Sequence, residues 1–192
     1  MKNNSTKSKM LLNQWLMFTD KDLKKKNIII WLWFIWSNLA FALMKTWFEN
    51  FILVDYDKVE EKNLLNQMYV KQLVWLNKAT ALSNILLSTA KEWVWIPVFA
   101  VWKNIKWENY LDELLKDKVE NTNIFVSTDN LSSKQNMIEK LTKNIWKIKN
   151  TTIFVAWANW EWMLLDTIYI KDWKEVLKDN EKKQELINHL KY

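Results

Sequence analysis

The chain has 192 residues, a formal net charge of +6 and 15 tryptophans, but no glycine, cysteine or arginine. This length suits one domain with a full hydrophobic core. The absence of cysteine excludes disulfides, thiolate zinc sites and thiol nucleophiles. Because the lysines are spread along the chain and no nucleic-acid-binding motif accompanies them, we expect a solvated surface and no nucleic-acid partner.

No secretion signal is evident in the N-terminal segment, and none is expected. Its first ten residues are polar and no cleavage site follows a short apolar segment, so we expect a cytoplasmic protein. Residues 1–9 are expected to be disordered. Short helical segments at Met10–Phe18 and Asp20–Lys26 should lead into the first strand. The lone histidine, His189, is expected to lie on the surface without a catalytic role.

The next segment has two interpretations. The apolar run Ile28–Met44 has lysines on both flanks and nearly the length of a membrane-spanning helix. The same residues also read as a strand over Asn27–Ile30, a loop, a helix over Ser37–Lys45 and a strand over Asn50–Val54. In that interpretation, the positions that match G-x-G-x-x-G are Trp31, Trp33 and Trp36. The layout is that of a nucleotide-binding βαβ unit with tryptophan at every glycine position.

Composition supports the substitution of tryptophan for glycine. The 15 tryptophans are about 8% of the chain, close to the roughly 7% of glycine in an average protein. Glycine is also the only residue that enters positive φ freely. We hypothesise that these codons are UGA, decoded as glycine in the source organism, and UGG codons at positions 31, 33 and 36 would contradict this. The alternative is a genuinely tryptophan-rich chain.

The remaining pattern alternates strands with helices. Residues 57–74 are polar and irregular, and Asp172-Trp173 is an exit turn. The predicted helices are Asn77–Lys91, Asn109–Leu115, a helix from Ser132 to Ile145, and residues 174–191. The predicted strands are Pro97–Val101, Asn123–Ser127, Thr152–Ala156 and Leu164–Ile170. This alternation predicts a single α/β, Rossmann-like domain, with a mainly parallel sheet and helices on both faces.

Glycines at the loop positions would have a physical purpose. They would permit the tight turn, let backbone amides approach a phosphate and bring the helix close to the sheet. The helix N-terminus would add partial positive charge, and Ser37 a hydroxyl donor. Three indoles would instead fill the phosphate volume.

Several later segments form an ordered set of motifs. Asp55-Tyr56-Asp57-Lys58-Val59-Glu60 is followed by Asn63, Asn66-Gln67, the segment from Val74 to Lys78, and Ser127-Thr128-Asp129-Asn130. The set resembles the ThiF/MoeB family of adenylyltransferases, which activate ubiquitin-like and sulfur-carrier proteins. The resemblance covers roughly residues 10–172, and position 75 again has tryptophan where the family has glycine.

The resemblance implies a role for each motif residue. Asp55 would accept hydrogen bonds from the ATP ribose, and Asp57 would support it. Lys78 would stabilise charge on the phosphates, and Asp129 would hold Mg²⁺. Asn63 and Gln67 would contact phosphate or shape the loop. The structural alternatives are a turn-capping carboxylate at Asp55 and an N-cap role for Asp129.

The chain also departs from the family. Asn66 and Asn13 stand where arginines are common, and an amide lacks the charge and bidentate geometry of guanidinium. Lys62 or Lys71 could compensate. The catalytic and zinc-binding cysteines of longer members are missing, so we expect no zinc and a reaction that stops at the acyl-adenylate or passes it to an external nucleophile.

We therefore expect an ATP-dependent adenylyltransferase that uses ATP and Mg²⁺. Its partner would be a small ubiquitin-like or sulfur-carrier protein, and family analogy suggests a homodimer with no membrane partner. An NAD(P)-binding oxidoreductase with the same βαβ unit is an alternative. So is a non-enzymatic protein, either a degenerate nucleotide-binding module or a tryptophan-rich chain that associates with membranes.

Overall fold

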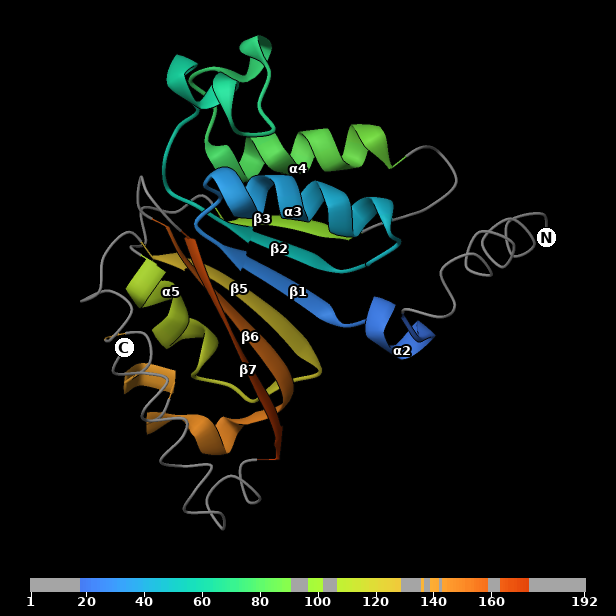
Figure 1. Cartoon of the computed structure of the whole chain (residues 1–192), viewed down its shortest axis with the longest axis vertical. Coiled ribbons are helices and arrows are strands. Elements are labelled where there is room, and N and C mark those ends of the chain that lie inside the picture. The colour runs from blue at the N-terminus through green and yellow to red at the C-terminus, as the bar shows by residue number, and fades with distance from the viewer. Residues whose placement is uncertain are drawn as a thin grey trace, which may run out of the picture.

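The computed structural model describes residues 18–90, 97–101, 107–128, 136, 139–141, 143–158 and 163–172. These residues form a seven-stranded sheet of order β3-β2-β1-β5-β6-β4, with β7 paired to β6 (Figure 1). All neighbours pair in parallel except β6 and β7. The strands are β1 Lys26–Ile30, β2 Phe51–Val54, β3 Val98–Val101, β4 Val119–Glu120, β5 Thr122–Thr128, β6 Ile148–Ala158 and β7 Met163–Asp172. The predicted α/β, Rossmann-like fold is confirmed.

Helices cover both faces of the sheet. Figure 1 shows α3 (Phe34–Lys45) and α4 (Lys78–Thr89) on one face and α5 (Trp107–Leu114) on the other. The short helix α2 (Asp20–Leu23) precedes β1. Two 3₁₀ helices, Glu61–Leu65 and Lys71–Leu73, lie between β2 and α4, and a third covers Ile145–Lys147.

The central strand β1 is buried on both faces. Ile29 belongs to the apolar cluster under α3 and α4, whereas Ile28 and Ile30 belong to the cluster that includes Leu111 of α5. Successive strand side chains point to opposite faces, so a strand covered on both sides needs a continuous apolar run. This requirement explains why the run resembles a membrane span in the sequence.

The run Ile28–Met44 is in fact divided between β1, a loop and α3. Within the ranges given above, the structure contains no helix that is both long enough and apolar enough to cross a bilayer.

Element boundaries differ from the predictions at a few points. Helix α3 begins at Phe34, three residues before Ser37, because Trp33 is the extended N-cap residue. Strands β6 and β7 are longer than predicted because they pair with each other as an antiparallel ribbon. The two-residue strand β4 was not predicted, since two residues show no periodicity. Residues 1–17, Ser132 and residues 173–192 lie outside the described ranges. The predictions made for these residues therefore also lie outside the part of the chain that the structure describes.

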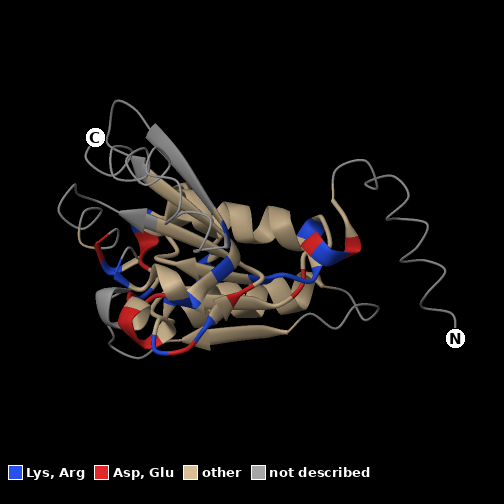
Figure 2. Ribbon diagram, turned by 90° about the horizontal axis from the view of Figure 1, so that it is seen from below, with Lys and Arg blue, Asp and Glu red and all other residues tan. Residues whose placement is uncertain are grey.

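Charge is distributed as the sequence suggests. Figure 2 shows lysines and acidic residues interleaved on the side that it presents, without a large face of one sign. The expectation of a solvated, mixed surface therefore fits this part of the molecule.

Candidate functional site

The candidate site lies where the chain leaves β1 and β2. The connection from β1 leads to β2 on one side, and β5 lies on the other side, so the order reverses beside β1. In open α/β sheets ligands bind at the carboxyl ends of strands next to such a reversal. The loop at positions 31–33 and the carboxylates at 55 and 57 both follow strands at this edge.

Asp55 ties the end of β2 to the loop after β1. Its Oδ2 accepts the backbone N–H of Leu32 at 2.8 Å, and its Oδ1 accepts that of Asp57 at 2.8 Å. The side chain is almost fully buried. Burial raises the pKa of Asp55 to about 6, although Lys78 and the two N–H donors oppose that rise. Asp55 is thus an anion held in place by backbone donors and a nearby cation.

Lys78 meets the same strand end from the start of α4. Its Nζ lies 3.1 Å from Oδ2 of Asp57, with the lysine side chain 6% exposed and the aspartate 38%. The pairing places a buried cation between the carboxylates and the first turn of a helix. Since a helix N-terminus already carries partial positive charge, a lysine there is unfavourable without an anionic partner. Here Asp57 supplies one, and an anionic ligand would supply another.

Two of the motif tryptophans have a backbone conformation that suits glycine. Trp31 has φ 69° and Trp75 has φ 74°. For a residue with a Cβ, this left-handed region costs roughly 1–2 kcal/mol. Trp75 turns the chain into α4, donating its N–H to the carbonyl of Val59 at 2.9 Å. The backbone therefore has the left-handed conformation typical of glycine at position 31 of the G-x-G motif and at position 75 of the Gly-x-x-Lys motif.

A third tryptophan closes α3 in the same way. Trp47 has φ 71° and follows the C-cap residue Thr46. The N–H of Trp47 donates to the carbonyl of Met44, and that of Phe48 to the carbonyl of Leu43, both at 3.1 Å. These two bonds form a Schellman motif, in which glycine usually occupies the position of Trp47. The other described residues with positive φ are all asparagines: Asn50, Asn121 and Asn150.

The remaining loop residues point in different directions. The indole of Trp36 is buried in the core, edge-on to the ring of Phe125 at 5.5 Å, so it does not fill the space in front of the helix. Trp33, the N-cap residue of α3, has 44% of its surface exposed. Ser37 is fully buried, and its hydroxyl donates to the carbonyl of Phe34 at 3.3 Å. In this arrangement that hydroxyl proton is already engaged.

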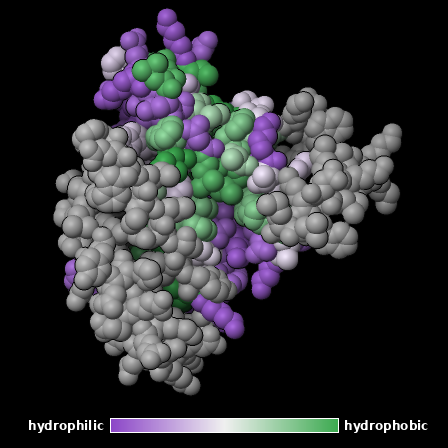
Figure 3. Space-filling view, in the orientation of Figure 1, coloured by the Kyte–Doolittle hydropathy of each residue, from purple (hydrophilic) through white to green (hydrophobic). Residues whose placement is uncertain are grey.

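The segment between β2 and α4 also contributes. Asn63 is buried and its Oδ1 accepts the N–H of Glu60 at 2.9 Å, so it shapes the segment. Gln67 is buried, and neither polar atom of its amide has a hydrogen-bond partner in the described part of the chain. Buried amides are normally satisfied, so this amide fits a site completed by a ligand. The surface at the top of Figure 3 combines hydrophilic residues with a hydrophobic patch, and Leu65 and Val70 of this segment are exposed.

Two residues of this network were not singled out by sequence reasoning. Tyr69 is buried and donates its hydroxyl to the carbonyl of Leu32 at 3.3 Å. Burial, together with the charges of Asp55 and Asp57, raises the pKa of Tyr69. Asn77 caps α4 and also bonds the β2 end. An Asn before a helix is a recognisable N-cap signal, whereas nothing in the sequence marks Tyr69.

Asp129 lies outside the described residues, so the structure does not place it. Among the residues that are described, no group of three acidic or histidine side chains is positioned to hold a metal ion.

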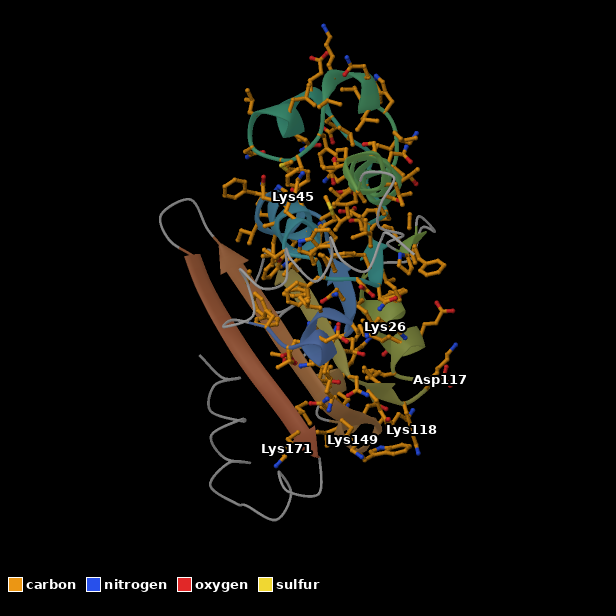
Figure 4. All side chains as sticks on the ribbon, turned by 90° about the vertical axis from the view of Figure 1, so that its right-hand side faces the viewer. Lys26, Lys45, Asp117, Lys118, Lys149 and Lys171 are labelled. Atoms are coloured by element: carbon orange, nitrogen blue, oxygen red, sulfur yellow. The ribbon has the colours of Figure 1, made fainter. Side chains whose placement is uncertain are left out.

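A cavity of about 720 Å³ lies at the opposite edge of the sheet. Its lining includes Lys26 and Thr122, which begin β1 and β5, together with Asp117 and Lys118. Figure 4 shows Lys26, Asp117 and Lys118 in the lower part of the molecule, away from the segment between β2 and α4. The cavity contains none of the predicted site residues and is separate from the candidate site.

The backbone at position 75 leads to a stability prediction. In the chain with tryptophan, Trp75→Gly should raise the free energy of unfolding by about 1 kcal/mol, because strain is relieved. Little burial is lost, since Trp75 is 75% exposed. Trp146→Gly is the control: Trp146 is also exposed but is not among the positive-φ residues, so glycine there should lower stability by about 1 kcal/mol. Urea unfolding measures both, and equal effects would contradict the prediction.

Comparison with known proteins identifies the fold. No family model matches the chain, and no curated protein does. Escherichia coli MccB, solved with MccA, is 21% identical, with a TM-score of 0.65, over 88% of this chain and 49% of MccB. The described fold is therefore similar to that of about half of MccB.

Two further structures agree. MccB solved with ATP is 25% identical over 71% of this chain and 38% of MccB, with a TM-score of 0.56. E. coli TcdA, a tRNA N6-threonylcarbamoyladenosine dehydratase, is 18% identical over 74% of this chain and 59% of TcdA, with a TM-score of 0.58. The chain thus spans less than two thirds of the length of either neighbour.

Proposed function

We propose that the chain is an ATP-dependent adenylyltransferase that activates the C-terminal carboxylate of a small ubiquitin-like or sulfur-carrier protein. The observation that carries the proposal is the meeting of Asp55, Asp57 and Lys78 beside the loop that opens α3. An acidic strand end for the ribose, a buried lysine and a helix N-terminus for the phosphates are what an ATP site at this edge requires.

The structural neighbours support the same kind of enzyme. MccB and TcdA are ATP-dependent adenylating enzymes of the ThiF/MoeB type, and MccB has been solved both with ATP and with MccA. The family is the one that the motifs resemble. A small protein or peptide carboxylate as the acceptor is our extension of that likeness to this chain.

The reaction would proceed by displacement at phosphorus. A carboxylate oxygen attacks the α-phosphorus of ATP, the bond from that phosphorus to the bridging oxygen breaks, and pyrophosphate leaves with the electron pair. Lys78 would stabilise the charge that develops on the phosphates, and Asp55 would hold the ribose. Catalysis would come from orientation and charge without a nucleophile from the enzyme. We further propose that Asp129 holds Mg²⁺ and that the protein is a cytoplasmic homodimer.

Glycine at the fifteen tryptophan positions belongs to this proposal. The positive φ of Trp31, Trp47 and Trp75 supports it, as does the match of positions 31 and 75 to glycines of the family motifs. With glycine at 31 and 33, the loop amides can face a phosphate without an intervening side chain. Sequencing the gene tests the idea directly, because UGA codons would support it and UGG codons would end it.

The activity is tested by ATP–pyrophosphate exchange. The chain with glycine at all fifteen positions should exchange labelled pyrophosphate into ATP when a carrier protein with a free C-terminus is present. The same carrier with an amidated C-terminus is the matched control and should not support exchange. Binding of NAD(P) without exchange would instead favour the oxidoreductase alternative. Binding of ATP without exchange for any carrier tried would favour a non-enzymatic nucleotide-binding module.

A further inference from the structure

We propose that Asn77 is a positioning residue that fixes Lys78 against the end of β2, an inference that rests on the proposed adenylation function. Asn77 is the N-cap residue of α4, and its Oδ1 accepts the N–H of Thr80 at 3.1 Å. Its Nδ2 makes two further bonds, to the carbonyl of Asp55 at 2.8 Å and to that of Asp57 at 3.1 Å. One amide side chain therefore joins the helix start to the strand end.

These bonds exceed what helix capping needs. An N-cap requires only an acceptor, which serine, threonine and aspartate also provide. Among the favoured N-cap residues, only asparagine combines that acceptor with two N–H donors. Both donors are used on the carbonyls of the two residues whose carboxylates face the site. An asparagine at position 77 is thus suited to link the start of α4 to the end of β2.

Lys78 is the residue that this link controls. Its backbone N–H donates to the carbonyl of Asp57 at 2.8 Å. Its side chain is buried, and the ammonium group at its end pairs with the carboxylate of Asp57. An isolated bridge also joins Lys58 and Asn77. If the link is lost, the start of α4 can shift relative to β2, and the ammonium group moves relative to the phosphates. Misplacement by about 1 Å can cost on the order of 100-fold in rate.

The test compares variants that keep the cap but lose the link. Asn77→Ser and Asn77→Asp both retain an acceptor for Thr80, so we expect the melting temperature to stay within about 3 °C of the parent. We expect kcat for ATP–pyrophosphate exchange to fall about 10- to 100-fold with KM for ATP little changed. Asn77→Ser removes the two N–H donors without adding a charge, whereas Asn77→Asp removes them and adds a negative charge. Comparison of the two variants therefore separates these effects. Asn144→Asp loses a comparable side-chain bond, from Nδ2 to the carbonyl of Lys140, and should leave exchange unchanged.

A double variant distinguishes positioning from a general structural effect. If Asn77 acts through Lys78, Asn77→Ser combined with Lys78→Ala should be no slower than Lys78→Ala alone. If the rate losses of the two single variants multiply in the double variant, the proposal is overturned. An exchange rate in Asn77→Ser equal to that of the parent would also overturn it.

A second measurement does not depend on activity. The rate at which acetic anhydride modifies Lys78, followed by mass spectrometry, should be several-fold higher in Asn77→Ser than in the parent. An unchanged rate would overturn the positioning role. A parent without any exchange activity, but with faster modification in the variant, would refute adenylation and leave the structural link standing.

Discussion

Lys78→Ala is expected to lower the rate of adenylate formation by about 100-fold or more, with a smaller effect on KM for ATP. The reason is geometric and electrostatic. The ammonium group is buried at the start of α4, where its charge is poorly screened, and it lies beside the proposed phosphate site. Pre-steady-state formation of the acyl-adenylate is the direct measurement, because it isolates the chemical step from release of product.

Two other variants sharpen this result. Lys143→Ala is the matched control, because Lys143 pairs with Glu139 at 2.5 Å with both side chains well exposed. We expect its rate to stay within about 2-fold of the parent, as exposed pairs contribute little. Lys78→Arg should recover only part of the loss, since a planar guanidinium does not fit a site built for a compact ammonium group. A fully active Lys78→Ala would remove this lysine from the mechanism.

The second large effect is the pH dependence of stability from Asp55. Its pKa rises from 3.8 in the unfolded chain to about 6 in the fold. Below pH 3.8 the carboxyl is neutral in both states, so its burial carries no charge penalty. Between pH 3.8 and 6 the carboxyl of the unfolded chain is ionised while the buried one still holds its proton, so the native state loses about 3 kcal/mol relative to the unfolded chain over that range, and the loss is complete above pH 6.

Asp55→Asn exposes that contribution. The difference in unfolding free energy between variant and parent should shift in favour of the variant by about 2.5 kcal/mol from pH 4 to pH 7. Urea titrations at each pH measure the difference. Asp22→Asn is a control of opposite sign, because the Thr19 hydroxyl holds the pKa of Asp22 below its usual value. For this control, the stability advantage of the parent over Asp22→Asn should shrink as the pH falls. If the difference in unfolding free energy between Asp55→Asn and the parent does not change with pH, the burial argument is refuted.

Sequence periodicity predicted the strands that matter for the site. Ile28 to Ile30 form a continuous apolar run because β1 is covered on both faces, and the predicted strand over Asn27–Ile30 differs from β1 by one residue. The same reasoning failed for β4, which has two residues, and for the lengths of β6 and β7. Those lengths depend on pairing between strands, and a partner is not visible in a local pattern.

The candidate site divides in a similar way. The order of the motifs predicts that Asp55, Asp57 and Lys78 belong to one site, and the structure has these residues in contact with one another. The order of the motifs did not reveal that both oxygens of Asp55 are engaged by backbone N–H groups, that Asn77 joins two elements or that Tyr69 contacts the loop. Each of these bonds, except that between Asp55 and Asp57, spans more than twenty residues of chain, so only folding creates it.

By itself, the sequence determined the alternation of strands and helices, the ordered motifs and the excess of tryptophan over an absent glycine. These are local or compositional properties, and a chain carries them before it folds. Only the tertiary structure decided which tryptophans stand where the backbone turns left-handed, at positions 31, 47 and 75. Backbone dihedrals at a turn are set by the elements that the turn must join, so this distinction arises from packing and hydrogen bonding across the whole fold.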